Sequence, residues 1–497
     1  SRSRAMRDGT PEGTVQHQRL SISLSDEQKA KYDKMADAWS VVLNNINEAL
    51  KDTNGSADAK KNAMGAFWGA EQRFFNQVIT SMATPETIKS IEKDLAEGRS
   101  PVIGVVNTGE SSTKRAKARL EDDETIEDMD VSPREILMQY LENSFPIHRH
   151  ETYLDDDGNE RQRLVTVPIK DEYGKPVLGA DGKPVTKPVE DPNAVRRRDA
   201  LLDHIGSLKD VVPESPLDQI INHFGHEMVA EATGRTQRRI LRKQPDGERK
   251  YELEKRKPEL ANDTEARAFQ NGEKKILIFS DAGGTGRSYH ASRKVKNQGR
   301  RVHYMLQPGW RADAAMQALG RTHRTNQSSA PIYVLPEMTE IRAQKRFIST
   351  IARRLDQLGA LGKGQRQTGG GGMFGAADNL ESEQAQDALD VFFRKLKHGG
   401  IDGLEYHAVM GQMGFSTEED KKKGRGNKEE EHTMPQFLNR MLALKIDQQQ
   451  KVFEAFDKIH QDTILAAEEA GALDHGVEDY KAHSVTPVSD DVVFRDP

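Results

Sequence analysis

The residues best suited to chemistry in this chain are residues 317–327, which read Gln-Ala-Leu-Gly-Arg-Thr-His-Arg-Thr-Asn-Gln. In a helix, spacings of four and three place Gln317, Arg321 and Arg324 on one face. Arginine forms bidentate hydrogen bonds with phosphate oxygens and keeps its charge at any working pH. A second face at the same spacings consists of Met316, Leu319 and His323. The stretch therefore predicts a helix that packs on one face and holds phosphate on the other.

A glycine-rich loop, residues 281–288 (Asp-Ala-Gly-Gly-Thr-Gly-Arg-Ser), is a second candidate phosphate site. It is not a Walker A motif, because no glycine lies five residues before Gly286 and Arg287 stands in place of the lysine. Clustered glycines still let backbone amides approach phosphate or a nucleic-acid backbone. A plain turn between a strand and a helix explains the glycines equally well, so both interpretations stay open.

Basic residues gather just after this loop, at Arg293, Lys294, Lys296, Arg300 and Arg301. The whole chain has a net charge of −6, which argues against a protein that coats nucleic acid but not against a local basic groove. The cluster is either an ordinary solvated face or a surface that follows phosphates. Surface salt bridges are likewise the alternative for Arg321 and Arg324, but the neighbouring glycine-rich loop favours a phosphate-binding role.

Four apolar segments predict the strands that position these residues: 102–106, 275–279, 301–306 and 331–335. Helical patterns separate the segments, so we expect an α/β fold with a parallel sheet. Loops that follow parallel strands gather at the carboxyl edge of the sheet, where ligands bind. We therefore expect the glycine-rich loop and the arginine-bearing helix to meet at that edge.

The chain of 497 residues is too long for one core, so we divide it into three parts. These are a helical lead-in over 1–83, an α/β lobe over 84–375 with an insertion at about 114–270, and a helical accessory domain over 376–497. Thr84 and Pro85 predict a helix that begins with the lobe. Within the insertion, a Gly-Lys-Pro-Val unit recurs at a period of eight and predicts solvated hairpins.

Composition excludes several classes of chemistry. The sequence has no cysteine, so disulfides, thiolate catalysis and cysteine-bound zinc are ruled out, and we assign no metal ligand to the chain. No segment resembles a signal peptide or a spanning helix, so we expect a cytoplasmic protein with no membrane partner. Residues 217–240 could form a helix-turn-helix, although helical pairs that contain glycine are common without DNA binding. Because the chain begins Ser-Arg-Ser-Arg, we expect a segment of something longer.

Three segments, taken in order, resemble the second RecA-like lobe of the Strawberry notch family of superfamily two helicases. Residues 102–110 (Val-Ile-Gly-Val-Val-Asn-Thr-Gly-Glu) are similar to the family's fourth motif. Residues 280–293 (Ser-Asp-Ala-Gly-Gly-Thr-Gly-Arg-Ser-Tyr-His-Ala-Ser-Arg) are similar to its fifth motif, and residues 317–327 to its sixth. Similar stretches at 72–75, 233–235, 345–347 and 354–360 extend the resemblance over 25–375. Residues 378–381 and 437–444 resemble the helical tail of bacterial and phage members.

The resemblance implies roles for the candidate site. Arg321 and Arg324 would be arginine fingers for an ATP molecule, which with its Mg²⁺ would be held mainly by a first RecA-like lobe on the same parent protein or another chain. Further nucleotide-site residues would be Gln317, Gly320, Gly284, Thr285 and Gly286. Contacts with the DNA backbone would come from Thr108, Gly109, Arg287, Ser288, Arg293, Lys294 and Lys296. Two departures weaken the fifth-motif assignments, because the family usually has an aliphatic residue at Arg287 and an aspartate at Ser292.

We therefore predict the second motor lobe of an ATP-dependent DNA helicase or translocase. The parent would be a large phage or mobile-element protein in a bacterial host, with a role in protecting invading DNA. Without Walker A and Walker B elements, the chain alone should neither bind ATP tightly nor hydrolyse it. The alternatives are a structural or virion-packaged interaction protein that keeps the lobe as a scaffold, and a DNA-binding module that acts through residues 217–240.

Overall fold

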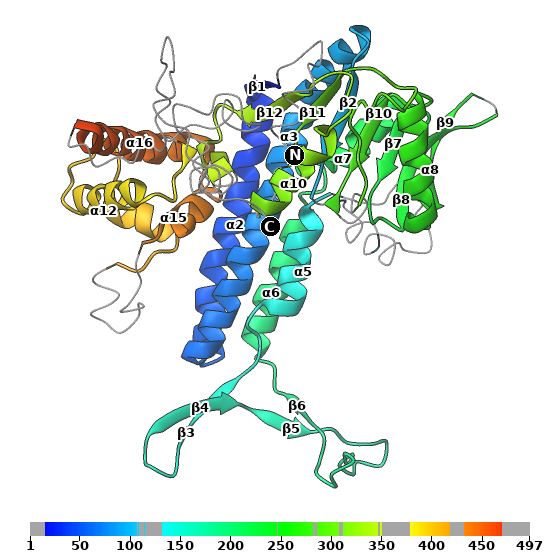
Figure 1. Ribbon diagram of the computed structural model, residues 1–497. Coiled ribbons are helices and arrows are strands. Elements are labelled where there is room, and N and C mark those ends of the chain that lie inside the picture. Colours follow the sequence, from blue (N-terminus) through cyan, green and yellow to red (C-terminus); the bar gives the residue numbers. More distant parts are fainter. Residues whose placement is uncertain are drawn as a thin grey trace, which may run out of the picture.

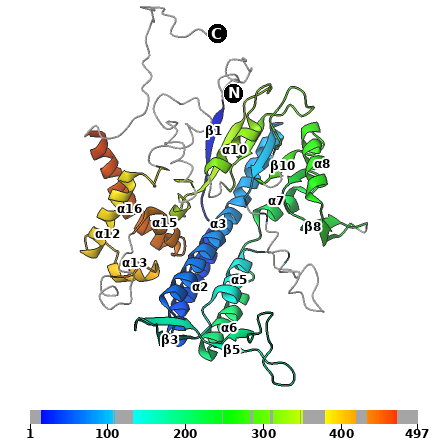
Figure 2. The same cartoon turned by 60° about the horizontal axis from the view of Figure 1, so that its bottom comes forward.

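The structure is a computed structural model that describes residues 15–106, 108, 114, 132–245, 247–281, 286–307, 312–345, 348–349, 378–417 and 432–469. A parallel sheet lies at one end of two long helices, α2 (Asp26–Asp52) and α3 (Ala57–Ala96) (Figure 1). A group of C-terminal helices packs on one side of this pair, and a β arm projects from its far end (Figures 1 and 2). The long helices therefore separate the sheet from the arm.

The sheet has six strands in the order β1-β12-β11-β2-β10-β7, and every neighbouring pair is parallel. Its strands are β1 (Gln16–Ile22), β2 (Ser100–Gly104), β7 (Val229–Ala232), β10 (Ile276–Phe279), β11 (Arg301–Tyr304) and β12 (Ile332–Met338). The α/β class and the parallel sheet expected from the sequence are confirmed, and four of these strands match the predicted apolar segments. The flanking helices α7 (Pro216–Phe224), α8 (Pro258–Asn271) and α10 (Ala312–Thr322) complete the lobe.

Both faces of the sheet are covered, as parallel sheets require. Successive residues point to opposite faces, so Ile103 joins a core with Ile91 of α3 and Leu217 of α7. Its neighbour Val102 joins the other core, with Phe269 of α8. This alternation fixes the register of the central strands.

Two strands of the sheet were not predicted from the sequence. Strand β1 is an edge strand with mostly polar, partly exposed residues, so it has no apolar run. Strand β7 lies within the stretch expected as an insertion, yet it pairs with β10 over Val229–Ala232. Its apolar pattern is interrupted by Glu231, which is fully buried. A charged residue in so short a buried strand breaks the apolar run by which a buried strand is recognised in a sequence.

The expected helix start at Thr84 is wrong, because α3 continues through Pro85 to Ala96. The Thr84 hydroxyl donates to the Thr80 carbonyl within the helix, at 2.8 Å. Pro85 has no N–H for the Ser81 carbonyl, and its ring disturbs the preceding turn. The amide of Gln219 donates to the Ser81 carbonyl at 3.2 Å instead. A partner distant in sequence thus supports a proline inside the helix, and the expected boundary between 83 and 84 falls within this element.

The helix-turn-helix considered as one possibility for residues 217–240 does not form. Helix α7 ends at Phe224, and Gly225 follows with φ of 84°, a left-handed conformation that favours glycine. The chain then enters β7 and the antiparallel pair β8 (Gln237–Lys243) and β9 (Arg249–Lys255). No recognition helix is present in this stretch, so DNA binding through a helix-turn-helix is excluded.

The remaining helices share one continuous core with α2 and α3. It includes α5 (Arg134–Ser144), α6 (Pro192–Gly206), η2 (Arg342–Gln344), α12 (Glu383–Lys397), α13 (Tyr406–Gln412), α15 (Met434–Met441) and α16 (Ile446–Glu469). Trp39 of α2 packs against Phe67 and Phe74 of α3, with ring centroids 5.2 and 5.4 Å apart. The aromatic stretch 67–75 is therefore a packing face of the helix pair.

The predicted hairpins exist and form the β arm, residues 149–190. Its strands are β3 (His150–Leu154), β4 (Glu160–Leu164), β5 (Thr166–Pro168) and β6 (Thr186–Pro188). Gly158, Gly174 and Gly182 have φ between 75° and 79° in its three turns. Nearly every residue of the arm is exposed, as expected for a solvated insertion.

Candidate functional site

The arginine-bearing stretch is helical only in its first half. Helix α10 ends at Thr322, so Arg324 lies beyond it and the predicted shared face of Gln317, Arg321 and Arg324 is wrong. Gln317 and Arg324 are exposed, whereas Arg321 is only 8% exposed. A Cβ atom at Gly320, one turn from Gln317, would meet nothing within 4 Å. The two arginines therefore occupy different environments.

The end of α10 is explained by Thr322, whose side chain is buried. Its hydroxyl donates to the Leu319 carbonyl at 3.1 Å and lies 2.9 Å from Nδ1 of His303 on β11. Burial lowers the pKa of His303 to about 3, so this imidazole is neutral at physiological pH. The side chain of Gln327, which is also buried, accepts a hydrogen bond from the Arg324 backbone N–H at 3.2 Å. These contacts close the turn that presents Arg324.

Segments 287–293 and 321–328 are joined by hydrogen bonds into one unit. The Tyr289 N–H donates to the Arg321 carbonyl at 2.7 Å, and Nη1 of Arg321 donates to the Arg287 carbonyl at 3.1 Å. Further along, the Arg293 N–H donates to the Asn326 carbonyl at 3.0 Å. Tyr289 packs with Phe279 and Val102, so the unit lies on the face of the sheet covered by α8. The two segments meet as expected, but across this face rather than only at the carboxyl edge.

Arg301, expected in a solvated basic cluster, is instead buried beneath segment 287–293. Its guanidinium donates to the Tyr289 carbonyl at 2.8 Å, the Asn297 carbonyl at 3.0 Å and Oε1 of Gln270 at 2.8 Å. It also lies over the ring of Phe269, 5.0 Å from the centroid. Burial without an acidic partner lowers the pKa of Arg301 to about 9. Nothing in the run of basic residues distinguishes the buried Arg301 from its neighbours.

The other predicted contact residues are dispersed around this unit. Arg293, Lys294 and Lys296 are exposed, as are Gly286 and Ser288. Arg287 is engaged within the chain, because its Nη2 lies 2.7 Å from Oδ1 of Asp263 on α8. Thr108 is half-buried after β2. Gly109, Gly284 and Thr285 lie outside the described residues.

His290 adds an uncharged group near the arginines. Burial, together with the positive charges of Arg301 and Arg324, lowers the pKa of His290 to about 4. Arg324 is exposed and forms no ion pair with any described residue. The sequence analysis did not single out His290, because a lone histidine after a glycine-rich loop has no recognisable spacing.

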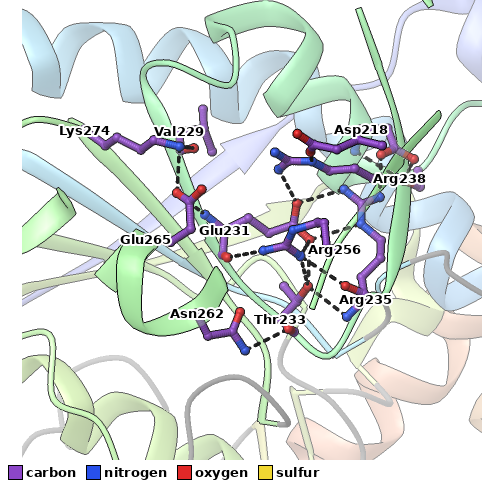
Figure 3. A network of polar contacts seen from close by, with 12 residues as sticks. Asp218, Val229, Glu231, Thr233, Arg235, Arg238, Arg256, Asn262, Glu265 and Lys274 are labelled. Atoms are coloured by element: carbon purple, nitrogen blue, oxygen red, sulfur yellow. Dashed lines mark hydrogen bonds and ion pairs between the residues drawn. The ribbon is translucent and has the colours of Figure 1, made fainter. Parts of the chain in front are cut away.

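The stretch 233–235 belongs to a buried charge network around Glu231 (Figure 3). Oε1 of Glu231 accepts from Nε of Arg235 at 3.0 Å, and Oε2 accepts from Arg238 at 2.8 Å. Arg256 donates to Oε1 at 2.9 Å, and Asp218 of α7 pairs with Arg235 at 2.7 Å. The three guanidinium groups hold the pKa of Glu231 well below its usual range, despite complete burial.

This network has a structural consequence. It joins α7, β7, β8 and β9, so the strand at the edge of the sheet is fixed by charges from four elements. Paired charges with satisfied hydrogen bonds are the condition under which burial of ions is tolerated. The network thus positions the sheet edge and leaves no free carboxylate for catalysis. No group of histidine and acidic residues suited to a metal ion occurs in the described parts of the chain.

A parallel α/β lobe in which two such loops are joined on one sheet face has the architecture of a RecA-like helicase lobe. Residues 215–479, more than half of the chain, match the family model of the C-terminal domain on Strawberry notch homologues. The chain belongs to the Strawberry notch helicase C-terminal domain family.

Whole-chain relatives agree with this assignment. The chain is 27% identical to Protein FORGETTER 1 of Arabidopsis thaliana over 93% of its length, and 28% identical to Protein strawberry notch homolog 2 of Mus musculus over 92%. It spans only 44% and 38% of those proteins. It is also 33% identical to the Caenorhabditis elegans homolog over 58% of the chain and 16% of that protein. These relatives are eukaryotic and do not support the expected bacterial or phage type.

No solved structure matches the chain. Among the described helices, none has the length and apolar character needed to cross a bilayer.

Proposed function

We propose that this chain is the second motor lobe of an ATP-dependent superfamily two DNA helicase or translocase. The single observation that carries the proposal is the hydrogen-bonded unit of segments 287–293 and 321–328, which leaves Arg324 exposed and without an ion pair to any residue that the structure describes. A nucleotide and its Mg²⁺ would be held mainly by a first lobe. Arg324 would then meet the phosphates across the interface between the lobes.

The two arginines have different roles in this proposal. Arg324 donates to oxygens of the transferring phosphoryl group, where an arginine finger contributes about 10³ to 10⁵ in rate. Arg321 is buried and bound to the Arg287 carbonyl, so it positions the unit and touches phosphate only if lobe closure uncovers it. Gln317 and Gly320 lie on an open part of α10 and would face the first lobe.

The same unit would connect the nucleotide to DNA. Arg293, Lys294 and Lys296 extend from the segment that binds the Arg324 loop, and they would contact backbone phosphates. Since Arg293 and Asn326 are hydrogen-bonded, movement of one segment displaces the other. Lobe closure and reopening would thus shift the DNA contacts. Two further groups complete the proposed site. The nucleotide contacts would include Gly284, Thr285 and Gly286, and the DNA contacts would include Thr108, Gly109, Arg287 and Ser288.

The test is DNA-stimulated ATP hydrolysis by the parent protein that carries both lobes. Arg324→Ala should lower kcat about 10³-fold or more while the KM for ATP changes little. Arg324→Lys should recover part of the rate, since the charge returns without the bidentate fork. The matched control is Arg196→Ala, which removes an exposed arginine from α6 and should leave turnover unchanged.

Unchanged turnover in Arg324→Ala would instead favour the second candidate, a non-catalytic scaffold. The burial of Arg321 and the ion pair between Arg287 and Asp263 are the observations on its side. A phage or mobile-element parent, an anti-restriction role and a cytoplasmic or virion location stay predictions.

A further inference from the structure

Two imidazoles lie close to Arg324, the proposed arginine finger. His323 precedes Arg324 in the chain, and His290 belongs to segment 287–293. Burial lowers the pKa of His290 to about 4, and the charges of Arg301, Arg324 and His323 act in the same direction. A further positive charge is therefore unfavourable here, but a neutral imidazole can still donate a hydrogen bond from its single N–H.

The side chain of Gln327 connects the backbone of Arg324 to the ring of His323. Its Oε1 accepts a hydrogen bond from the Arg324 N–H at 3.2 Å, and its Nε2 lies 3.1 Å from Nδ1 of His323. Gln327 is only 2% exposed, so water has little access to either contact. One buried amide thus uses its acceptor on Arg324 and its donor on His323.

The Arg324 N–H determines the orientation of this amide. A backbone N–H can only donate, so the atom of Gln327 that faces it must be the amide oxygen. If the amide were turned round, its NH₂ group would face the Arg324 N–H, and two buried donors would each lose an acceptor. Nε2 of Gln327 must therefore face His323.

The orientation of the amide determines where His323 carries its proton. The NH₂ group of Gln327 can only donate, so Nδ1 of His323 has to accept the hydrogen bond. The single proton of the neutral imidazole then lies on Nε2. A proton on Nδ1 would place an N–H of His323 against the NH₂ group of Gln327. His323 is therefore held as an uncharged ring with its donor at Nε2.

The backbone on both sides of Gln327 is fixed by segment 287–293. The Ser328 N–H donates to the Ala291 carbonyl at 2.8 Å, and Ser292 and Gln327 form an antiparallel bridge. Asn326 has φ of 61°, a left-handed conformation that turns the chain just before Gln327. The amide therefore cannot leave His323 unless contacts between the two segments break.

We propose that His323 is a further phosphate contact of this site and that Gln327 is its positioning residue. The inference rests on the proposed function, in which Arg324 meets the transferring phosphoryl group. Nε2 of His323 donates to a phosphoryl oxygen beside the Arg324 guanidinium, and Gln327 keeps the proton on that nitrogen. With the proton on Nδ1, the lone pair of Nε2 would face the phosphate and repel it. The neutral donor adds a hydrogen bond to the site and no charge.

The position of the proton can be measured on this chain alone, without nucleotide. Long-range ¹H–¹⁵N NMR correlations distinguish the two neutral tautomers of a histidine ring and its imidazolium form, and the signals lost in His323→Gln are those of His323. We expect the Nε2–H tautomer at about pH 7.5. A proton on Nδ1 in the wild type overturns the proposal.

Gln327→Glu tests the cause of this tautomer. The carboxylate can accept the Arg324 N–H but has no donor for His323, so a proton should appear on Nδ1, either in the other tautomer or in the imidazolium. The control is Gln412→Glu on the exposed surface of α13, which makes the same substitution and should leave the His323 signals unchanged. An unchanged His323 ring in Gln327→Glu also overturns the proposal.

ATP hydrolysis by the parent protein that carries both lobes tests the phosphate contact. His323→Leu removes the donor and should lower kcat about 10- to 100-fold, the range expected for one hydrogen bond to a charged group. His323→Gln should keep most of the rate, because its amide can donate from a position close to that of Nε2 in the imidazole. A normal rate in His323→Leu, in a parent protein that Arg324→Ala inactivates, refutes the contact and leaves the proposed function standing.

A double-mutant cycle separates the position of the proton from the added charge. Gln327→Glu should lower kcat about 10-fold or more in the wild-type background. The loss should be much smaller in the His323→Gln background, which has no imidazole to change its tautomer. Equal losses in the two backgrounds would mean that Gln327→Glu acts through its charge, and would refute the role of Gln327. Unchanged turnover in both Arg324→Ala and His323→Leu would overturn the proposed function together with this contact.

Discussion

Glu71 on α3 has a fully buried carboxyl group, and neither of its oxygens has a hydrogen-bond partner among the residues that the structure describes. The positive charge that acts on Glu71 is that of Arg440 on α15, but its guanidinium donates to the Gly414 carbonyl at 3.1 Å and lies over the rings of Trp68 and Phe415. Burial raises the pKa of Glu71 well above its ordinary value of 4.5, and Arg440 opposes this only in part. We therefore expect Glu71 to fold in its protonated form.

The sign of the resulting pH dependence follows from proton linkage. Below pH 4.5, Glu71 is protonated in both the folded and the unfolded chain and does not affect the balance. Above that pH the unfolded chain releases this proton while the folded chain keeps it. The free energy of unfolding then falls by up to about 1.4 kcal/mol per pH unit, until the pH passes the raised pKa of the folded state. Glu71 is thus destabilising at neutral pH.

Glu71→Gln removes the titration and keeps the shape of the side chain. The variant should be more stable than the wild type, by a margin that widens between about pH 5 and pH 8 to at most about 5 kcal/mol. Urea unfolding followed by tryptophan fluorescence at several pH values measures this margin, and Trp39 and Trp68 lie in the same core. The control is Glu468→Gln on the exposed end of α16, which makes the same substitution outside the core.

Parallel stability curves for wild type and Glu71→Gln would refute the reasoning. They would mean that the carboxyl group ionises in the folded chain with the help of Arg440, contrary to the contacts that occupy that guanidinium. A variant less stable than the wild type at every pH would mean that the carboxyl shape, rather than its proton, is what the core requires.

Three further predictions follow from the other buried polar groups. Glu231→Gln should lower the free energy of unfolding by about 3–5 kcal/mol near neutral pH, because it leaves buried arginines without their counter-charge. Because the pKa of Glu231 is lowered, the stabilisation that its charge supplies is present above pH 4.5 and is lost as the pH falls. The free energies of unfolding of the wild type and of Glu231→Gln should therefore converge at low pH. Arg301→Met should increase hydrogen exchange of the Tyr289 amide, since the carbonyls above Arg301 lose their donor, and exchange of β7 serves as the internal reference. Gln219→Ala should lower the free energy of unfolding by about 1 kcal/mol, because it leaves the Ser81 carbonyl unpaired. In a Pro85→Ala background the loss should be smaller, because the helix then supplies an N–H to that carbonyl. Equal losses in the two backgrounds would contradict the role of Gln219.

The fold can be predicted from the sequence where local composition and tertiary structure agree. Strands β2, β10 and β12 are mostly apolar, because a strand buried on both faces favours apolar side chains. Strand β11 alternates polar and apolar residues and is recognisable with the apolar residues Met305 and Leu306 that follow it. The hairpins of the arm are specified by Asp and Gly turns that need no partner beyond their own strands. In both cases the cause of the structure lies within a few residues.

Local structure cannot be predicted in this way where the partner of a polar group is distant in sequence. Strand β7 looks unlike a strand until Glu231 is seen with Arg256, which follows it by twenty-five residues. Thr84 and Pro85 have the types of a helix start, and only Gln219, far along the chain, makes a proline acceptable inside α3. The same reasoning applies to the candidate site: helical spacing assigned Arg321 and Arg324 to one surface, but the contact between Thr322 and His303 ends the helix between them. Tertiary hydrogen bonds therefore determine which arginine is exposed to a partner. The exposed arginine, Arg324, lies after the end of α10 and not within the helix.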